Sequence, residues 1–160
     1  MKTGKISVFI ATACVSAVMC LAAATASAQN AHMGTWKLNE AKSKFAAGAT
    51  KNHTVVYEAA GDSIKVIVDG TDGSGAATHN EWTGKFDRKY YPVTGDPTSD
   101  ERSYSRVNKN VMNLTARKGG KVTLTGRIVL TANGKHRTIT TNGTNAEGKA
   151  IRNVAYYDKQ

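Results

Sequence analysis

The feature that most constrains the fold is a succession of short β-prone runs separated by turn residues. From Lys51 onward, runs rich in Val, Ile, Thr and Tyr alternate with clusters of Gly, Asn and Asp, roughly every ten residues. This spacing is typical of an antiparallel sandwich or barrel. The expected strands are 34–38, 52–58, 63–68, 78–86, 90–93, 102–107, 111–117, 122–130, 137–142 and 151–157.

The connections between these strands are short enough for hairpins, which predicts an all-β, up-and-down antiparallel meander. Ile64, Val66 and Val68 share a strand face, with Lys65 opposite, so one face of the sheet is expected to be apolar. A meander of this length leaves no exposed edge if it closes, so we expect a barrel of about 8–10 strands. Gly84 and Gly126, inside two strands, are interpreted as bends that closure requires.

The N-terminus predicts export. Lys2 and Lys5 precede an apolar stretch, residues 6–24, that ends in Ala26-Ser27-Ala28. A basic start, an apolar run and an A-x-A site are the pattern of a secretory signal peptide. We therefore expect cleavage after Ala28, a single domain over 29–160 with no transmembrane segment, and a periplasmic or secreted location. The alternative is an anchor that is retained.

The amino-acid composition of residues 29–160 limits the chemistry and the classes of partner expected for the domain. Both cysteines, Cys14 and Cys20, lie in the predicted signal, so the domain has no disulfide and no thiolate chemistry. Residues 29–160 keep 20 of the 22 basic residues and all 12 acidic ones, a formal charge of +8. Basic residues are spread evenly and no nucleic-acid motif is present, so we expect no nucleic-acid partner. Solubility explains the charge, and attraction to an anionic envelope surface is the alternative.

The run MGTWKLNEAKSKF at residues 33–45, with YPVTG at residues 91–95, resembles the start and a later element of small secreted bacterial lipocalin-like proteins. These belong with the calycin barrels, whose signature is Gly-x-Trp. The resemblance implies a barrel that binds a small apolar or amphipathic molecule. It also implies that Trp36 packs across the closed end beneath a late-strand arginine. Arg152 is the preferred match for that arginine, and Arg137 is the second choice.

Aromatic residues near two cations are the candidate ligand site. Trp82 and Tyr104 are expected to point inward, with Arg102 and Arg106 nearby. Aromatic walls with one or two placed charges suit a pocket for an anionic amphiphile, while ordinary core packing is the alternative. Val, Ile, Leu and Phe make up only 21 of residues 29–160, which favours a narrow, partly polar interior.

No catalytic, metal or cofactor motif is recognisable, so we expect a non-enzyme without cofactor. The four histidines are scattered, and only His79 and Glu81 share a strand face as an acid–base pair would. A solvent-facing polar row explains that pair equally. The second function considered is an envelope protein that binds no ligand and presents basic loops to anionic surfaces. Residues 39–47, with Asn39 as N-cap, predict one short helical turn or a loop over a barrel end.

Overall fold

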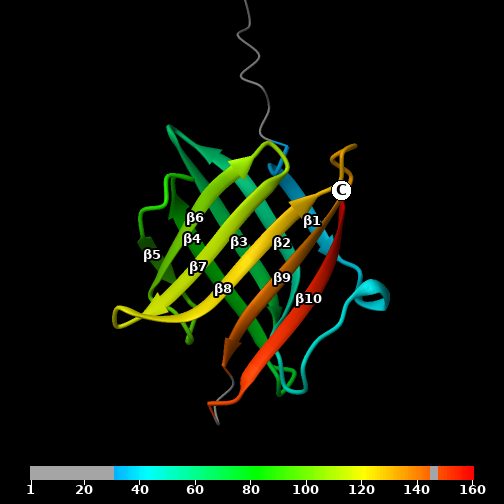
Figure 1. Ribbon diagram of the computed structural model, residues 1–160, viewed down its shortest axis with the longest axis vertical. Coiled ribbons are helices and arrows are strands. Elements are labelled where there is room, and N and C mark those ends of the chain that lie inside the picture. The colour runs from blue at the N-terminus through cyan, green and yellow to red at the C-terminus, as the bar shows by residue number, and fades with distance from the viewer. Residues whose placement is uncertain (1–30, 145–147) are drawn as a thin grey trace, which may run out of the picture.

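The structure is a computed structural model that describes residues 31–144 and 148–160, so the predicted signal peptide, 1–28, lies outside the described residues. The described chain folds into one closed antiparallel barrel (Figure 1). Its strands are β1 Gly34–Leu38, β2 Lys51–Ala60, β3 Ser63–Thr71, β4 Ala77–Gly84, β5 Tyr91–Thr94, β6 Glu101–Asn108, β7 Val111–Lys118, β8 Lys121–Leu130, β9 His136–Thr144 and β10 Ala150–Lys159.

Each strand pairs with the next one along the chain, and β1 closes the barrel by pairing with both β10 and β2. The all-β, up-and-down barrel expected from the sequence is therefore confirmed, at the upper end of the expected strand number. Closure satisfies the backbone groups of both edge strands, which would otherwise remain open to pairing with another chain. Within the described residues, no helix is long and apolar enough to cross a membrane.

Alternation along the strands fills the barrel interior. Trp36, Val55, Val68 and Asn80 lie side by side on β1 to β4, in register, and all four are buried. The polar member of this row is a first sign that the interior is not purely apolar. The largest buried side chains are aromatic or cationic, which compensates for the low count of branched aliphatic residues.

β1 is short, and the chain that follows it spans the gap between β10 and β2. A single 3-10 turn at Glu40–Lys42 begins at Asn39, whose side chain accepts a hydrogen bond from the Lys42 amide at 3.2 Å. Lys44 then pairs with Val154 through two backbone hydrogen bonds of 2.7 and 2.8 Å. The predicted helical turn with its N-cap is thus confirmed, and the segment extends the wall of the barrel beyond the end of β1.

β4 ends at Gly84, two residues earlier than the alternation predicted. Phe86 leaves the ladder and stacks on Trp82, with ring centroids 6.3 Å apart and planes 14° apart. A Cβ at Gly84 would lie 2.6 Å from the rings of both Trp82 and Tyr91. The glycine is therefore required by the close approach of two aromatic rings rather than by a bend alone.

The two ends of the barrel differ. The closed end, uppermost in Figure 1, contains the start of β1, the end of β10 and the β2–β3, β4–β5, β6–β7 and β8–β9 connections. The open end contains the connections β1–β2, β3–β4, β5–β6, β7–β8 and β9–β10. Bulky buried side chains such as Trp36, Arg137 and Tyr157 are concentrated toward the closed end.

Candidate functional site

The closed end is sealed by a tryptophan and an arginine. Trp36 on β1 is fully buried, and its ring N–H donates to the carbonyl of His32 at 2.9 Å. The guanidinium of Arg137 on β9 lies 4.5 Å from the Trp36 ring centroid. The preferred candidate for this position, Arg152, is not there: it is exposed, on the outer face of β10. The assignment to Arg152 is corrected to Arg137, the second choice.

The reason lies in strand register. Arg137 pairs with Tyr157, whose side chain is buried, so both side chains point inward, whereas Arg152 is an odd number of residues from Tyr157 and points outward. The Arg137 guanidinium also faces the rings of Tyr57 and Tyr157, at 4.9 and 5.1 Å. Its nitrogens have no hydrogen-bond partner among the described residues, so the ring faces hold the charge. Burial raises the pKa of Tyr157 to about 12.

The middle of the barrel holds an aromatic cluster. Trp82 and Tyr104 are 1% and 3% exposed, and their ring centroids are 4.8 Å apart. Tyr57, Phe86 and Tyr91 surround this pair, with centroid distances of 5.6 to 6.4 Å to one or both of its rings. Both residues point inward, as the alternation predicted. They are packed against one another and buried, so neither ring forms a wall open to solvent.

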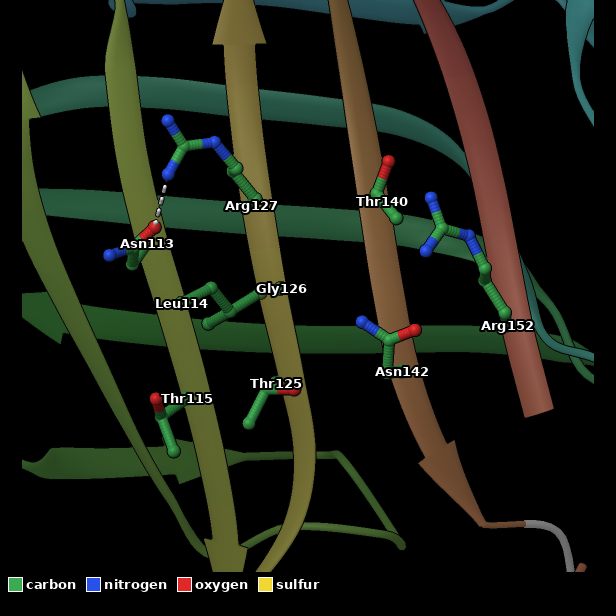
Figure 2. A pocket seen from close by; sticks show the side chains of 9 residues that line it. All are labelled: Asn113, Leu114, Thr115, Thr125, Gly126, Arg127, Thr140, Asn142 and Arg152. Atoms are coloured by element: carbon green, nitrogen blue, oxygen red, sulfur yellow. Dashed lines mark hydrogen bonds between the residues drawn. The ribbon is translucent and has the colours of Figure 1, made fainter. Parts of the chain in front are cut away.

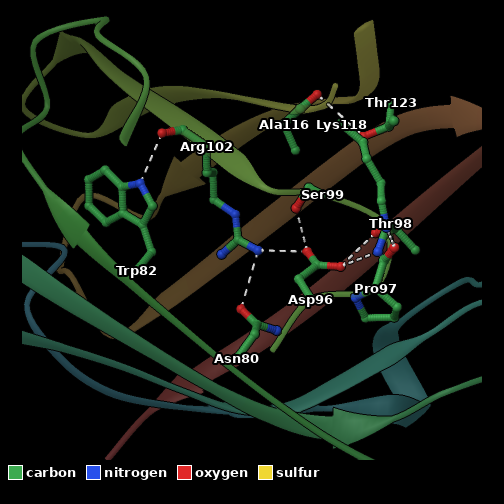
Figure 3. Close-up of polar contacts among 10 residues, drawn as sticks. All are labelled: Asn80, Trp82, Asp96, Pro97, Thr98, Ser99, Arg102, Ala116, Lys118 and Thr123. Carbon is green, nitrogen blue, oxygen red and sulfur yellow. Dashed lines mark hydrogen bonds and ion pairs between the residues drawn. The ribbon is translucent and has the colours of Figure 1, made fainter. Parts of the chain in front are cut away.

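Arg102 lies on the open-end side of this cluster and is already paired. Its terminal nitrogen donates to Asn80 at 3.2 Å and to Asp96 at 3.1 Å, and the arginine and aspartate side chains are only 10% and 15% exposed (Figure 3). The Arg102 carbonyl accepts the Trp82 ring N–H at 2.9 Å. These contacts connect Arg102 and its polar partners to the aromatic cluster. We refer to Arg102, Asn80 and Asp96 as the Arg102 cluster.

Asp96 reaches the interior from the β5–β6 loop. Gly95, with φ +78°, begins this loop, and a Cβ there would collide with the His79 carbonyl oxygen. Asp96 then accepts hydrogen bonds from the amide and hydroxyl of Thr98, at 2.8 and 2.7 Å, and from the Ser99 hydroxyl at 2.6 Å. Burial opposes ionisation, but these hydrogen bonds and the charge of Arg102 together lower the pKa of Asp96.

Arg106 does not join the other three predicted ligand residues. It lies four residues beyond Arg102 on β6, about 13 Å along the strand, and it is exposed toward the closed end. There its charge, with that of Arg137, adds to burial in lowering the pKa of His32 to about 4. Trp82, Tyr104 and Arg102 are therefore brought together as buried residues, whereas Arg106 lies two residues beyond Tyr104 and is exposed.

Inward-facing side chains near the open end remain partly exposed. Water reaches such side chains through the barrel end and, at Leu114, also through the wall beside Gly126, where both residues line a pocket on the outer face. These inward-facing side chains are apolar on β7, β8 and β10 and polar on β9. Gly126 and Gly143 also face inward but have no side chain. The partly exposed inward residues on these strands are Leu114, Leu124, Thr141 and Ile151.

The acid–base pair lies on the outside. His79 and Glu81 alternate with the buried Asn80 and Trp82, and their side chains are 58% and 37% exposed. His79 bonds Asp69 at 2.6 Å, and this hydrogen bond raises the pKa of His79. The pair is thus part of a solvent-facing polar row. Among residues 31–144 and 148–160, no cluster of His, Cys, Asp or Glu could hold a metal ion.

A groove that the sequence did not indicate crosses the outer face of β7 to β10 (Figure 2). Its volume is about 470 Å³, and its lining contains two arginines and no carboxylate. We call it the outer groove. It is lined by Asn113, Leu114, Thr115, Thr125, Gly126, Arg127, Thr140, Asn142 and Arg152.

Sequence reasoning missed Asn80 and Asp96 as well as the outer groove. Asp96 stood in a recognisable turn, Asp-Pro-Thr-Ser, in which an aspartate accepts hydrogen bonds from the residues that follow it. That pattern predicts the local turn, but it does not indicate an inward arginine six residues away. The outer groove gave no signal, since its residues come from four strands and form no motif.

Comparison with known proteins does not place the chain in a family. No family model matches it, and no curated protein matches it. Among solved structures, it is similar to EF1p2_mFAP2b bound to DFHBI, at 9% sequence identity and a TM-score of 0.46. The match covers 83% of this chain and 96% of that one.

Proposed function

We propose that this protein is an exported, lipocalin-like barrel that binds a small amphipathic molecule at its open end without transforming it. The observation that carries the proposal is the combination of partly exposed apolar side chains with the buried, polar Arg102 cluster. Leu114, Leu124 and Ile151 provide partly exposed apolar side chains, and the Arg102 cluster is more fully buried. Apolar walls with a few fixed polar groups are the usual composition of small-molecule sites.

The charge state of the Arg102 cluster indicates the ligand's head group. Asp96 neutralises Arg102, so an acidic head group would have to compete with a carboxylate that is already in place. Displacing Asp96 would also break its hydrogen bonds to Thr98 and Ser99. We therefore favour a neutral head group, such as a hydroxyl or amide, over the anionic one that the sequence suggested.

The proposed role is non-catalytic binding. His79 and Glu81 lie outside the barrel and do not face the proposed ligand space. Export is proposed on the N-terminal sequence: Lys2, Lys5 and the Ala26-Ser27-Ala28 site are the pattern of a cleaved signal peptide. A periplasmic or secreted binding protein follows from these two proposals together.

The test combines a neutral fluorescent probe with a variant that fills the interior. N-phenyl-1-naphthylamine is apolar with a single neutral N–H, and its emission rises in apolar sites. A Cβ at Gly126 would lie 3.3 Å from the Leu114 side chain and 3.4 Å from Thr141, so Gly126→Leu places a side chain in the proposed space. We expect the variant to weaken probe binding at least tenfold, or about 1.4 kcal/mol.

The matched control is Val129→Leu on the same strand, because Val129 is 42% exposed and its side chain points outward. It should bind the probe as the wild type does. Equal binding by Gly126→Leu and the wild type, with both folded, would place the probe elsewhere and refute the site. Native mass spectrometry of the protein purified from its own cell envelope tests export and ligand binding together. The measured mass should equal that of a chain beginning at Gln29 plus a ligand, and denaturation should release the ligand.

A further inference from the structure

The outer groove carries two positive charges and no carboxylate. Arg127 on β8 and Arg152 on β10 both line it, and neither forms an ion pair within the described chain. The one hydrogen bond recorded for them is a long one, 3.5 Å from Arg127 to Asn113. By contrast, Arg117 on β7 is bound by Glu101 at 2.6 Å and stacks on the Tyr90 ring at 3.8 Å.

The two arginines are separated by neutral hydrogen-bonding side chains. Thr140 on β9 pairs with Arg127, and Asn142 on the same strand pairs with Arg152, so β9 lies between the two cations. Two strand spacings place their backbones roughly 10 Å apart or slightly more. Figure 2 shows Thr140 and Asn142 between the arginines, with the Arg152 side chain extending toward Thr140.

The sheet fixes this arrangement in advance. Thr115, Thr125, Asn142 and Arg152 form one cross-strand row on the outer face of β7 to β10, since each is paired in register with the next. Strand pairing fixes the backbone positions of these residues without a ligand, so binding has to order side chains but not the backbone. The groove therefore offers two cations with hydroxyl and amide groups between them.

We propose that the outer groove binds an acidic polysaccharide, with Arg127 and Arg152 each contacting a carboxylate and Thr140 and Asn142 contacting the neutral sugar between them. In a polysaccharide that alternates acidic and neutral sugars, a neutral sugar separates successive carboxylates, a gap of the same order as two strand spacings. Guanidinium groups recognise carboxylates through paired hydrogen bonds, and hydroxyl and amide side chains suit sugar hydroxyls.

The lining disfavours other polyanions. It contains no aromatic side chain on which a nucleic-acid base could stack. It offers little apolar surface for an acyl chain, because the side chain of Leu114, its one large apolar residue, points into the barrel. The site is on the opposite side of the sheet from the proposed interior ligand space, so it is independent of that proposal.

The test is isothermal titration of the protein with hyaluronate oligosaccharides, in which glucuronate alternates with a neutral N-acetylated sugar. We expect binding that weakens steeply as salt rises past the physiological range, because exposed charges are screened. Single variants Arg127→Gln and Arg152→Gln should each weaken binding about threefold to fivefold, and the double variant roughly tenfold or more.

A charge-matched control separates a site from general attraction. Lys109→Gln with Lys135→Gln removes the same two charges from exposed hairpin turns at the closed end. This double variant should change hyaluronate affinity less than twofold, and neutral dextran should not bind the wild type. The proposal is overturned if both double variants weaken binding equally, or if single-stranded DNA binds as tightly as hyaluronate and depends on Arg127 and Arg152 to the same extent. Binding of N-phenyl-1-naphthylamine should be unchanged in all these variants.

Discussion

The Arg102 cluster provides the sharpest test of the structure, through the variant Asp96→Ala. Removing the carboxylate leaves the Arg102 guanidinium, 10% exposed, with Asn80 as its one remaining partner in the cluster. Breaking a buried ion pair from one side typically costs about 3–5 kcal/mol, because the remaining charge is buried without compensation. For a domain of this size, that loss corresponds to a melting temperature roughly 10–20 °C lower.

The assay is urea unfolding of the wild type, Asp96→Ala, Arg102→Met and the double variant at neutral pH. Replacing both partners removes the uncompensated charge, so the double variant should recover most of the loss, with a coupling energy of at least about 2 kcal/mol. A cost below about 1 kcal/mol for Asp96→Ala, the range of exposed pairs, would refute the reasoning. It would mean that water reaches Arg102 freely.

The ion pair between Asp96 and Arg102 also makes the stability of the fold depend on pH in a defined direction. The pKa of Asp96 is lowered in the folded state, so its contribution to stability is fully present above its unfolded value near 3.8. The contribution is lost as pH falls below that value toward the folded pKa. The wild type should therefore lose more stability than Asp96→Asn between neutral pH and pH 3.

Two further predictions concern packing and titration. Gly84→Ala should destabilise the barrel by about 1–3 kcal/mol, because the added carbon would lie 2.6 Å from the Trp82 ring. Gly126→Ala should stay within about 1 kcal/mol of the wild type in urea unfolding, since it meets only movable side chains. In a nuclear magnetic resonance titration of the histidines, His32 should titrate near pH 4 and His79 above its ordinary value of 6.5. The contribution of His32 to stability is therefore present above pH 6.5 and is lost as the pH falls. The contribution of His79 is instead lost as the pH rises. A pKa of His32 above that of His79 would contradict the burial of His32.

The sequence by itself determined the architecture. Alternation and turn residues are local properties, so the strands, their meander order and the inward direction of Trp82 and Tyr104 could be predicted from short windows. The N-cap at Asn39 is local in the same sense. The Gly-x-Trp start indicated the position of Trp36, which the structure places fully buried at the closed end.

Only the tertiary structure decided which charges meet. Arg137 rather than Arg152 reaches Trp36, because the register of β9 against β10 fixes which arginine points inward. Asp96 neutralises Arg102, which changes the expected ligand from anionic to neutral. The outer groove arises because four strands align side chains that are far apart in the chain. Local sequence sets the direction of each side chain, whereas its partners depend on long-range strand pairing, which no short window contains.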